Sequence, residues 1–266
     1  MNKLAIIGGT GVYHPDLLEN TQEKSCLTPY GEMTYVTGTY QGKEIVFMTR
    51  HGKQHSIPPH RINYRANIYG LKRLGVTAII ATTAVGSTHT EVKPGEMVIP
   101  DQFLDFTHAR PSTFFDGDPF PVAHVDMTNP YCPVLRKLIC DGLREIGGAF
   151  HETGTYVCTE GPRFETAAEV QMFHRLGGDV VGMTNVPECQ LAREAEMAYA
   201  TISMVTNYGA GVSQTPLTHS EVVEAMEQNS ARFTRLLTWI FTHFDENMTS
   251  PAFHAMAEYG GFKVQS

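Results

Sequence analysis

Apolar residues along the chain follow two alternating patterns: short continuous runs, and recurrences every three or four positions. The runs are typical of buried strands, whereas the recurrences are typical of amphipathic helices. The runs predict strands at residues 4–7, 33–40, 44–49, 76–81, 95–106, 156–159, 179–183 and 199–206. The recurrences predict helices at about 64–74, 130–147, 163–175, 187–198 and 220–244. This alternation of strands and helices predicts an α/β fold around a mainly parallel or mixed sheet.

The domain organisation is predicted to be simple. A length of 266 residues is within the range of single α/β domains. We find no internal repeat, low-complexity segment or linker, so residues 1–266 are expected to form one domain. The tail from about residue 245 has little periodicity, and Gly260 and Gly261 suggest that it is loose and peripheral.

Composition narrows the class of protein. With 42% hydrophobic and 18% charged residues, the chain is that of a soluble globular protein. A formal net charge of −8 argues against a nucleic-acid surface, which would need a basic stripe. An anionic substrate must therefore be attracted by local groups.

The expected compartment is the cytoplasm. The first residues enter a glycine turn without a cleavage-site pattern, so they do not form a secretory signal. No stretch approaches the about 18 apolar residues of a membrane span, so no membrane partner is expected. The five cysteines are odd in number and lack CxxC spacing, which favours buried thiols over disulfides or zinc. His51 and His55 are four apart, but Gly52 lies between them and no glutamate follows His51, so no metal site is expected.

Polar residues follow two of the predicted strands in the region 155–188. Glu160, Arg163 and Glu165 follow the strand at 156–159, and Met183 and Thr184 close or follow the strand at 179–183. Because the carboxyl ends of parallel strands share one edge of a sheet, these side chains could all face one pocket. For single residues a plainer interpretation stays open: Glu165 as a helix cap, and Arg163 as a surface charge.

Three other strand ends carry groups that suit an anion. At the first, the backbone amides of Gly8–Gly11 and the Thr10 hydroxyl can bind an anion. Further donors follow two later strands, at Arg50 and His51 and at Thr82-Thr83-Ala84. The glycine turn lacks both GxGxxG and GxxxxGK, so NAD and ATP are poor candidates. Ser87 is not within GxSxG, which excludes that serine hydrolase signature. The residues alone thus predict an enzyme for a small phosphate-bearing or phosphate-using ligand.

These motifs, in this order, resemble the trimeric nucleoside phosphorylases, the family that contains methylthioadenosine phosphorylase and the 6-oxopurine nucleoside phosphorylases. The matching segments are 8–11, 50–52, 82–84, 160–164 and 182–188, so the resemblance covers nearly the whole chain. It implies a single-domain, three-layer αβα fold with a mixed, partly barrel-like sheet. It also implies phosphorolysis with inorganic phosphate as co-substrate and no cofactor, in a homotrimer or a dimer of trimers.

The resemblance also assigns site residues. The implied phosphate site consists of Thr10, Arg50, His51, Thr83, Thr184 and the backbone amide of Ala84. Met183 would lie against the ribose and Phe164 near the base. His124, in the irregular segment 107–129, would reach the neighbouring subunit's site, although it could be an ordinary loop residue.

Two positions favour a 6-oxopurine base, and with Arg50 they form the expected catalytic set. Methylthioadenosine phosphorylases carry aspartates where this chain has Asn207 and Gly209, and they lack a glutamate at the position of Glu165. The Asn207 amide can donate to a 6-oxo group and accept from protonated ring nitrogen 7, and Glu165 can accept from the hydrogen on nitrogen 1. The plainer alternative is that Asn207 is a turn residue and Glu165 a helix cap.

His219 is expected to face the 5′ end of the sugar. An imidazole can hydrogen-bond a 5′-hydroxyl but gains little from a thioether, so a hydroxyl is favoured over a methylthio group. His219 could instead face solvent at the start of its helix. S-methyl-5′-thioadenosine or S-methyl-5′-thioinosine phosphorylase is the alternative function, and a purine-binding protein with a decayed active site is a remote one.

Overall fold

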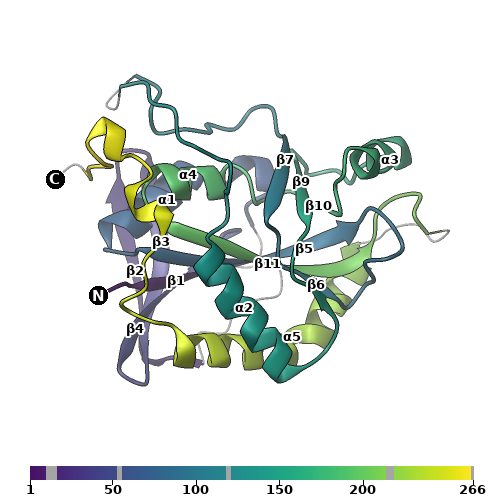
Figure 1. The fold of residues 1–266 in the computed structure, drawn as a ribbon, viewed down its shortest axis with the longest axis horizontal. Coiled ribbons are helices and arrows are strands. Elements are labelled where there is room, and N and C mark those ends of the chain that lie inside the picture. Colours follow the sequence, from purple (N-terminus) through teal and green to yellow (C-terminus); the bar gives the residue numbers. More distant parts are fainter. Residues whose placement is uncertain (10–16, 53–55, 118–120, 214–218, 265–266) are drawn as a thin grey trace.

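A mixed β-sheet forms the centre of the molecule (Figure 1). The computed structural model describes residues 1–9, 17–52, 56–117, 121–213 and 219–264, except the side chains of residues 219–222 and 228. Within these ranges the strands are β1 Leu4–Gly8, β2 Glu19–Thr28, β3 Gly31–Tyr40, β4 Lys43–Thr49, β5 Ala78–Ser87, β6 Met97–Val98, β7 Gln102–Phe106, β8 Phe150–His151, β9 Thr155–Thr159, β10 Val180–Gly182 and β11 Ala198–Tyr208. Their order is β2-β3-β4-β1-β5-β10-β9-β7, while β11 pairs with β5 and β6, and β8 pairs with β6.

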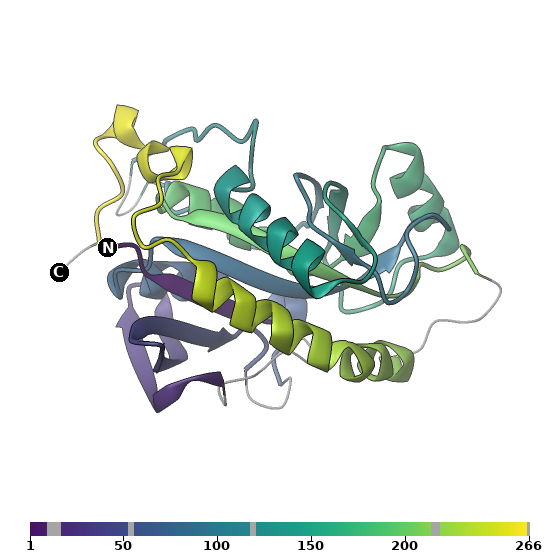
Figure 2. The same cartoon turned by 60° about the horizontal axis from the view of Figure 1, so that its bottom comes forward.

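Helices cover both faces of this sheet. They are α1 Tyr64–Arg73, α2 Pro133–Ile146, α3 Ala167–Arg175, α4 Glu188–Glu194 and α5 His219–His243, with short 3₁₀ turns η3 Pro59–Arg61, η4 Pro251–His254 and η5 Ala257–Tyr259. Helices α2 and α5 lie side by side on one face, and α1 and α4 pack together on the other (Figure 2). The expected mixed α/β fold with helical layers around a sheet is confirmed.

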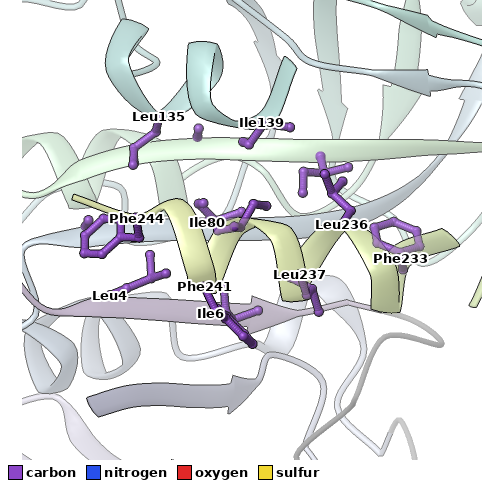
Figure 3. Close-up of a cluster of buried hydrophobic side chains, with 14 of the residues drawn as sticks. Leu4, Ile6, Ile80, Leu135, Ile139, Phe233, Leu236, Leu237, Phe241 and Phe244 are labelled. Atoms are coloured by element: carbon purple, nitrogen blue, oxygen red, sulfur yellow. The ribbon is translucent and has the colours of Figure 1, made fainter. Parts of the chain in front are cut away.

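The two apolar cores follow from the alternation of side chains along the central strands. Leu4 and Ile6 of β1 join the core under α2 and α5, which Figure 3 shows with Ile80 of β5. Ala5 and Ile7, the intervening residues, join the core under α1 and α4. Because successive side chains of a strand point to opposite faces, a continuous apolar run is buried on both sides.

The sheet opens along one edge of β5. Strand β11 pairs with β5 along its whole length, so β1 and β10 share the other edge. The β1 pairing covers 78–81, and the β10 pairing covers only Gly86 and Ser87. Residues 82–85 thus have a neighbouring strand on one side only, and on the open side the backbone oxygen of Thr82 accepts a hydrogen bond from Arg50.

Strand direction corrects one expectation. Strand β10 is antiparallel to β5 and parallel to β9. The segments after β9 and β10 therefore approach from the opposite direction to the ends of β1 and β4, and meet them beside the middle of β5. The site does not lie at a common carboxyl edge, and Thr82, Thr83 and Ala84 lie within β5 rather than in a loop after it.

Several element boundaries also differ from the prediction. Strand β2 was not predicted, because its residues are mostly exposed at the edge of the sheet and form no apolar pattern. The strand expected at 95–106 is two strands, β6 and β7, with Pro100 between them. Helix α4 ends at Glu194, and Ala198 begins β11 instead of continuing the helix.

The segment after α5 packs against the rest of the chain. Ala252, Met256 and Phe262 are buried in the two main cores, which is closer packing than the weak periodicity of this tail suggests. Four of the five cysteines are buried as expected, whereas Cys26 is partly exposed. No helix in the described ranges is long and apolar enough to cross a membrane.

Candidate active site

A cavity of ≈ 410 Å³ lies beside the open edge of β5. Most of the site residues predicted from the sequence line this cavity. Those that line it are Arg50, His51, Thr83, Ala84, Phe164, Glu165, Met183, Thr184, Asn207 and Gly209. Thr10, His55 and the side chain of His219 are outside the described parts of the chain, so their predicted positions are untested.

Arg50 is the buried cation of this cavity. Its residue is 1% exposed, and its Nε and Nη2 each donate a 2.6 Å hydrogen bond to a different oxygen of Glu188. Nη1 donates to the backbone oxygen of Thr82 at 3.0 Å. Burial alone would lower the pKa of Arg50, but the Glu188 carboxylate more than offsets it, so the guanidinium stays charged. These bonds use three of the five N–H donors and hold the plane of the fork.

Two threonines of β5, Thr82 and Thr83, form hydrogen bonds through their hydroxyl groups beside this cavity. Thr82 Oγ1 accepts from the backbone N–H of Gly9 at 2.9 Å, which ties the end of β1 to β5. The Thr83 hydroxyl lies 3.0 Å from that of Ser203 on β11, and both residues are buried. Ser203 therefore orients the hydroxyl of a residue that lines the cavity.

The hydrogen bonding of His51 defines its tautomer. Its Nδ1 lies 2.9 Å from the backbone oxygen of Ile57, which can only accept. Nδ1 therefore carries a proton, and Nε2 can donate to an anion only when the ring is positively charged.

Glu165 lies in the cavity and does not cap a helix. The N-cap of α3 is Thr166, which forms a reciprocal capping box with Glu169. The Thr159 hydroxyl donates to Glu165 Oε1 at 2.6 Å. Burial raises the pKa of Glu165 above its usual value, although the Thr159 hydrogen bond opposes this. The helix-cap interpretation of Glu165 is thus excluded.

Two other charged residues do not line this cavity, contrary to the expectation of one shared pocket. Arg163 is exposed and pairs with Glu169 at 2.7 Å, as the surface-charge alternative held. Glu160 turns toward the segment after β7 and accepts from the backbone N–H of His108 at 2.7 Å. Both line a second, smaller cavity that adjoins the first at Glu165.

Asn207 lies at the carboxyl end of β11 and faces the cavity beside β5. A Cβ atom at position 86 would lie 3.0 Å from Asn207 Nδ2, so Gly86 leaves room for this amide. At position 209 a Cβ would lie 3.0 Å from both the Ser87 backbone oxygen and Val170. A larger side chain at Gly209 would press against these neighbours.

His124 does not line the cavity. It is exposed in the irregular segment after β7, and its backbone N–H donates to the Tyr259 hydroxyl at 3.1 Å. Whether it serves a neighbouring subunit stays a prediction.

Two residues behind the cavity lining, Glu188 and Arg110, were not predicted as site residues. Glu188 belongs to the matched segment 182–188, but its role as the partner of Arg50 depends on β4 and α4 meeting in space. Arg110 is buried and donates to the backbone oxygens of Val186, Thr159 and Glu160, so it ties together the segments after β9 and β10. An arginine within an irregular, polar segment gives no sequence signal for such a position.

Comparisons with known proteins identify the family of this chain. The family model described as "Phosphorylase superfamily" matches residues 3–242, and the chain belongs to that family. A 6-oxopurine nucleoside phosphorylase of Pyrococcus furiosus is 56% identical over 242 residues, covering 89% of this chain and 91% of the relative. A probable 6-oxopurine nucleoside phosphorylase of Dictyoglomus turgidum is 53% identical over 257 residues, covering 97% of each chain.

Relatives with a different named substrate are similar as well. An S-methyl-5′-thioadenosine phosphorylase of Thermofilum pendens is 46% identical over 258 residues, covering 96% of this chain and 97% of the relative. The crystal structure of a methylthioadenosine phosphorylase from an antarctic soil metagenomic library superposes with a TM-score of 0.88 at 37% identity, covering 97% of this chain and 91% of that one. The resemblance to nucleoside phosphorylases is confirmed.

Proposed function

We propose that this chain is a purine nucleoside phosphorylase that uses inorganic phosphate to cleave 6-oxopurine nucleosides, such as inosine and guanosine, to the free base and ribose 1-phosphate. One observation carries the proposal: Asn207 and Glu165 line the same cavity as Arg50, Thr83 and Thr184. Groups suited to a 6-oxopurine thus lie together with groups suited to phosphate. The names of the two relatives above 50% identity support the same substrate class.

Phosphate acts as nucleophile at the anomeric carbon. Arg50, the hydroxyls of Thr83 and Thr184 and the backbone of Ala84 hold it, with Thr10 and His51 as further contacts. Positioning the nucleophile lowers the entropic part of the barrier, and its charge stabilises the positive sugar ring of the transition state. Met183 lies against the ribose, and no cofactor takes part.

The departing base receives negative charge. Asn207 donates its amide hydrogen to the 6-oxo group and accepts from ring nitrogen 7 once that nitrogen has taken a proton from water, while Glu165 accepts from the hydrogen on nitrogen 1. Adenine has no hydrogen on nitrogen 1, so the half-buried Glu165 carboxylate would keep its hydrogen bond from Thr159 but find no donor on the base, at a cost on the order of 1–3 kcal/mol or more. Phe164 lies near the base, and Gly209 leaves this end of the site without the second carboxylate of the methylthioadenosine enzymes.

The proposal extends to the assembly and the cell. The chain would form a homotrimer or a dimer of trimers, in which His124 serves the active site of the neighbouring subunit. The enzyme would act in purine salvage in the cytoplasm. His219 would bond a 5′-hydroxyl. Methylthio nucleosides are the second candidate substrates, because one relative that covers nearly the whole chain is named for S-methyl-5′-thioadenosine.

The direct test is phosphate dependence. Purified protein with inosine should release hypoxanthine only when phosphate or arsenate is added, and with phosphate one ribose 1-phosphate should form per base. Equal release of base in phosphate-free buffer would indicate hydrolysis and overturn the proposal.

A further inference from the structure

Arg50 does not present an uncompensated positive charge to the cavity. Its two 2.6 Å hydrogen bonds to Glu188 form a bidentate pair in which both side chains are 0% exposed. Paired charges at this distance, shielded from water, cancel much of each other's field. Among the described residues that line the cavity, Arg50 is the sole Lys or Arg, so this pair sets much of the local charge.

Further hydrogen bonds from buried residues hold the Glu188 carboxylate in place. The Tyr199 hydroxyl donates to Glu188 Oε1 at 2.8 Å and also lies 3.2 Å from Asn185 Oδ1. The Asn185 amide in turn donates to the Tyr131 hydroxyl at 2.7 Å. All four side chains are buried, so the carboxylate has a fixed place rather than a mobile one.

A buried ion pair is not needed to hold this fold together, because apolar residues of similar volume are often as stabilising. The Arg50–Glu188 pair lies beside the groups proposed to bind phosphate, and this location suggests a role in binding. The pair leaves two N–H donors of Arg50 outside the bonds made with described residues, and so retains directional donors while lowering net positive charge.

We propose that Glu188 is a positioning residue that presents Arg50 to phosphate as a neutral ion pair, so that oriented hydrogen bonds rather than net charge hold the nucleophile. This inference rests on the proposed function in one respect, that phosphate is the co-substrate. Tight ground-state binding of the nucleophile would not speed its attack, because only interactions that strengthen in the transition state do so. Glu188 therefore lowers the affinity for phosphate and raises the turnover rate.

The test is Glu188→Gln, which keeps the size of the side chain and removes its charge. We expect this full-length variant to bind phosphate about tenfold more tightly by calorimetry, with a lower KM for phosphate, and to turn over inosine about tenfold more slowly. Loss of a residue that served stability alone would leave the affinity for phosphate unchanged or lower it. Phosphate binding equal to or weaker than that of the wild type would overturn the proposal.

Glu194→Gln is the matched control, because Glu194 is a buried carboxylate of the same helix α4 that does not line the cavity. It should leave phosphate affinity and turnover at the wild-type level. If Glu188→Gln does not fold, Glu188→Asp decides: it keeps the charge and shortens the reach, so turnover should fall while phosphate binds no more tightly. Tighter phosphate binding by Glu188→Asp would contradict charge neutralisation.

The outcome is separable from that of the proposed function. A wild-type protein that binds no phosphate, or cleaves nucleosides without it, refutes the phosphorylase proposal. A wild-type phosphorylase whose Glu188→Gln variant does not gain phosphate affinity refutes only the role of Glu188.

Discussion

The side-chain oxygen of Asn207 accepts a 2.7 Å hydrogen bond from the Thr206 hydroxyl. On its other side, Asn207 Nδ2 donates to the backbone oxygen of Tyr208 at 2.8 Å. Because a backbone carbonyl can only accept, Tyr208 fixes which end of the amide is nitrogen, and the Thr206 hydroxyl must then donate to the oxygen. The amide keeps one N–H and one lone pair for a ligand, in a defined orientation.

Asn207→Asp should lower kcat/KM for inosine by about 100-fold, the scale of losing one donor to a developing negative charge. The new carboxylate oxygen would oppose both the Tyr208 carbonyl and the 6-oxo group. Activity on adenosine should rise far less than activity on inosine falls, because Glu165 remains. Steady-state kinetics on both nucleosides measures this, and a full switch to adenosine would show that Glu165 does not select the base.

Arg50→Lys should raise the KM for phosphate by about tenfold or more, because lysine keeps a charge for Glu188 but loses the bidentate fork. It is a cleaner test than Arg50→Ala, which would also leave Glu188 buried and unpaired at a cost of about 3–5 kcal/mol. Phosphate titrations at saturating inosine give the value. Unchanged phosphate dependence in a folded Arg50→Lys variant would refute the assignment of Arg50 as phosphate anchor.

Glu194 should make the stability of the protein depend on pH near neutrality. Burial raises its pKa from 4.5 to about 7, although the Thr113 hydroxyl and the Phe114 N–H donate to it. The folded state thus favours the protonated form, so this contribution is fully present below about pH 4.5 and is lost as the pH rises through about 7. The difference between 4.5 and about 7 limits the effect to about 3 kcal/mol.

The measurement compares chemical denaturation of the wild type and Glu194→Gln between pH 5 and pH 8. The wild type should lose on the order of 1–3 kcal/mol of unfolding free energy that the variant, which cannot titrate at this position, does not lose. Parallel curves for the two proteins would mean that Glu194 does not titrate in this range.

The assembly should contain three chains or six. Light scattering should give about 88 kDa, three times 29.5 kDa, or twice that mass. His124→Ala should raise KM for the nucleoside without changing the mass, because His124 is exposed and makes its described hydrogen bond through the backbone. A fully active monomer would remove the shared-site idea.

The sequence predicted the fold best where burial determined the pattern. Strand β1 and helix α1 have cores on defined faces, so their periodicity located them. Strand β2 is polar because it lies exposed at the sheet edge, and periodicity does not detect such a strand. The direction of β10 depends on pairing with β5, which is a long-range property that local pattern does not encode.

The candidate site was predictable as a set of lining residues but not as a network. Arg50 and Asn207 were recognisable because motif order placed them in the family. Glu188 orients Arg50 from a distant part of the sequence, and Thr206 orients Asn207 from the adjacent position. Neither hydrogen bond can be predicted from the order of the motifs. Their geometry determines how much charge and which hydrogen bonds the ligand meets, and this became visible only in the structure.

Steady-state kinetics on four nucleosides tests directly how the site selects the base. Steady-state phosphorolysis of inosine, guanosine, adenosine and S-methyl-5′-thioadenosine should be measured on the same wild-type preparation at saturating phosphate. We expect kcat/KM for inosine and guanosine to exceed that for either adenine nucleoside by several powers of ten, since Glu165 would reject adenine. A higher kcat/KM for adenosine or S-methyl-5′-thioadenosine would contradict the roles of Asn207 and Glu165.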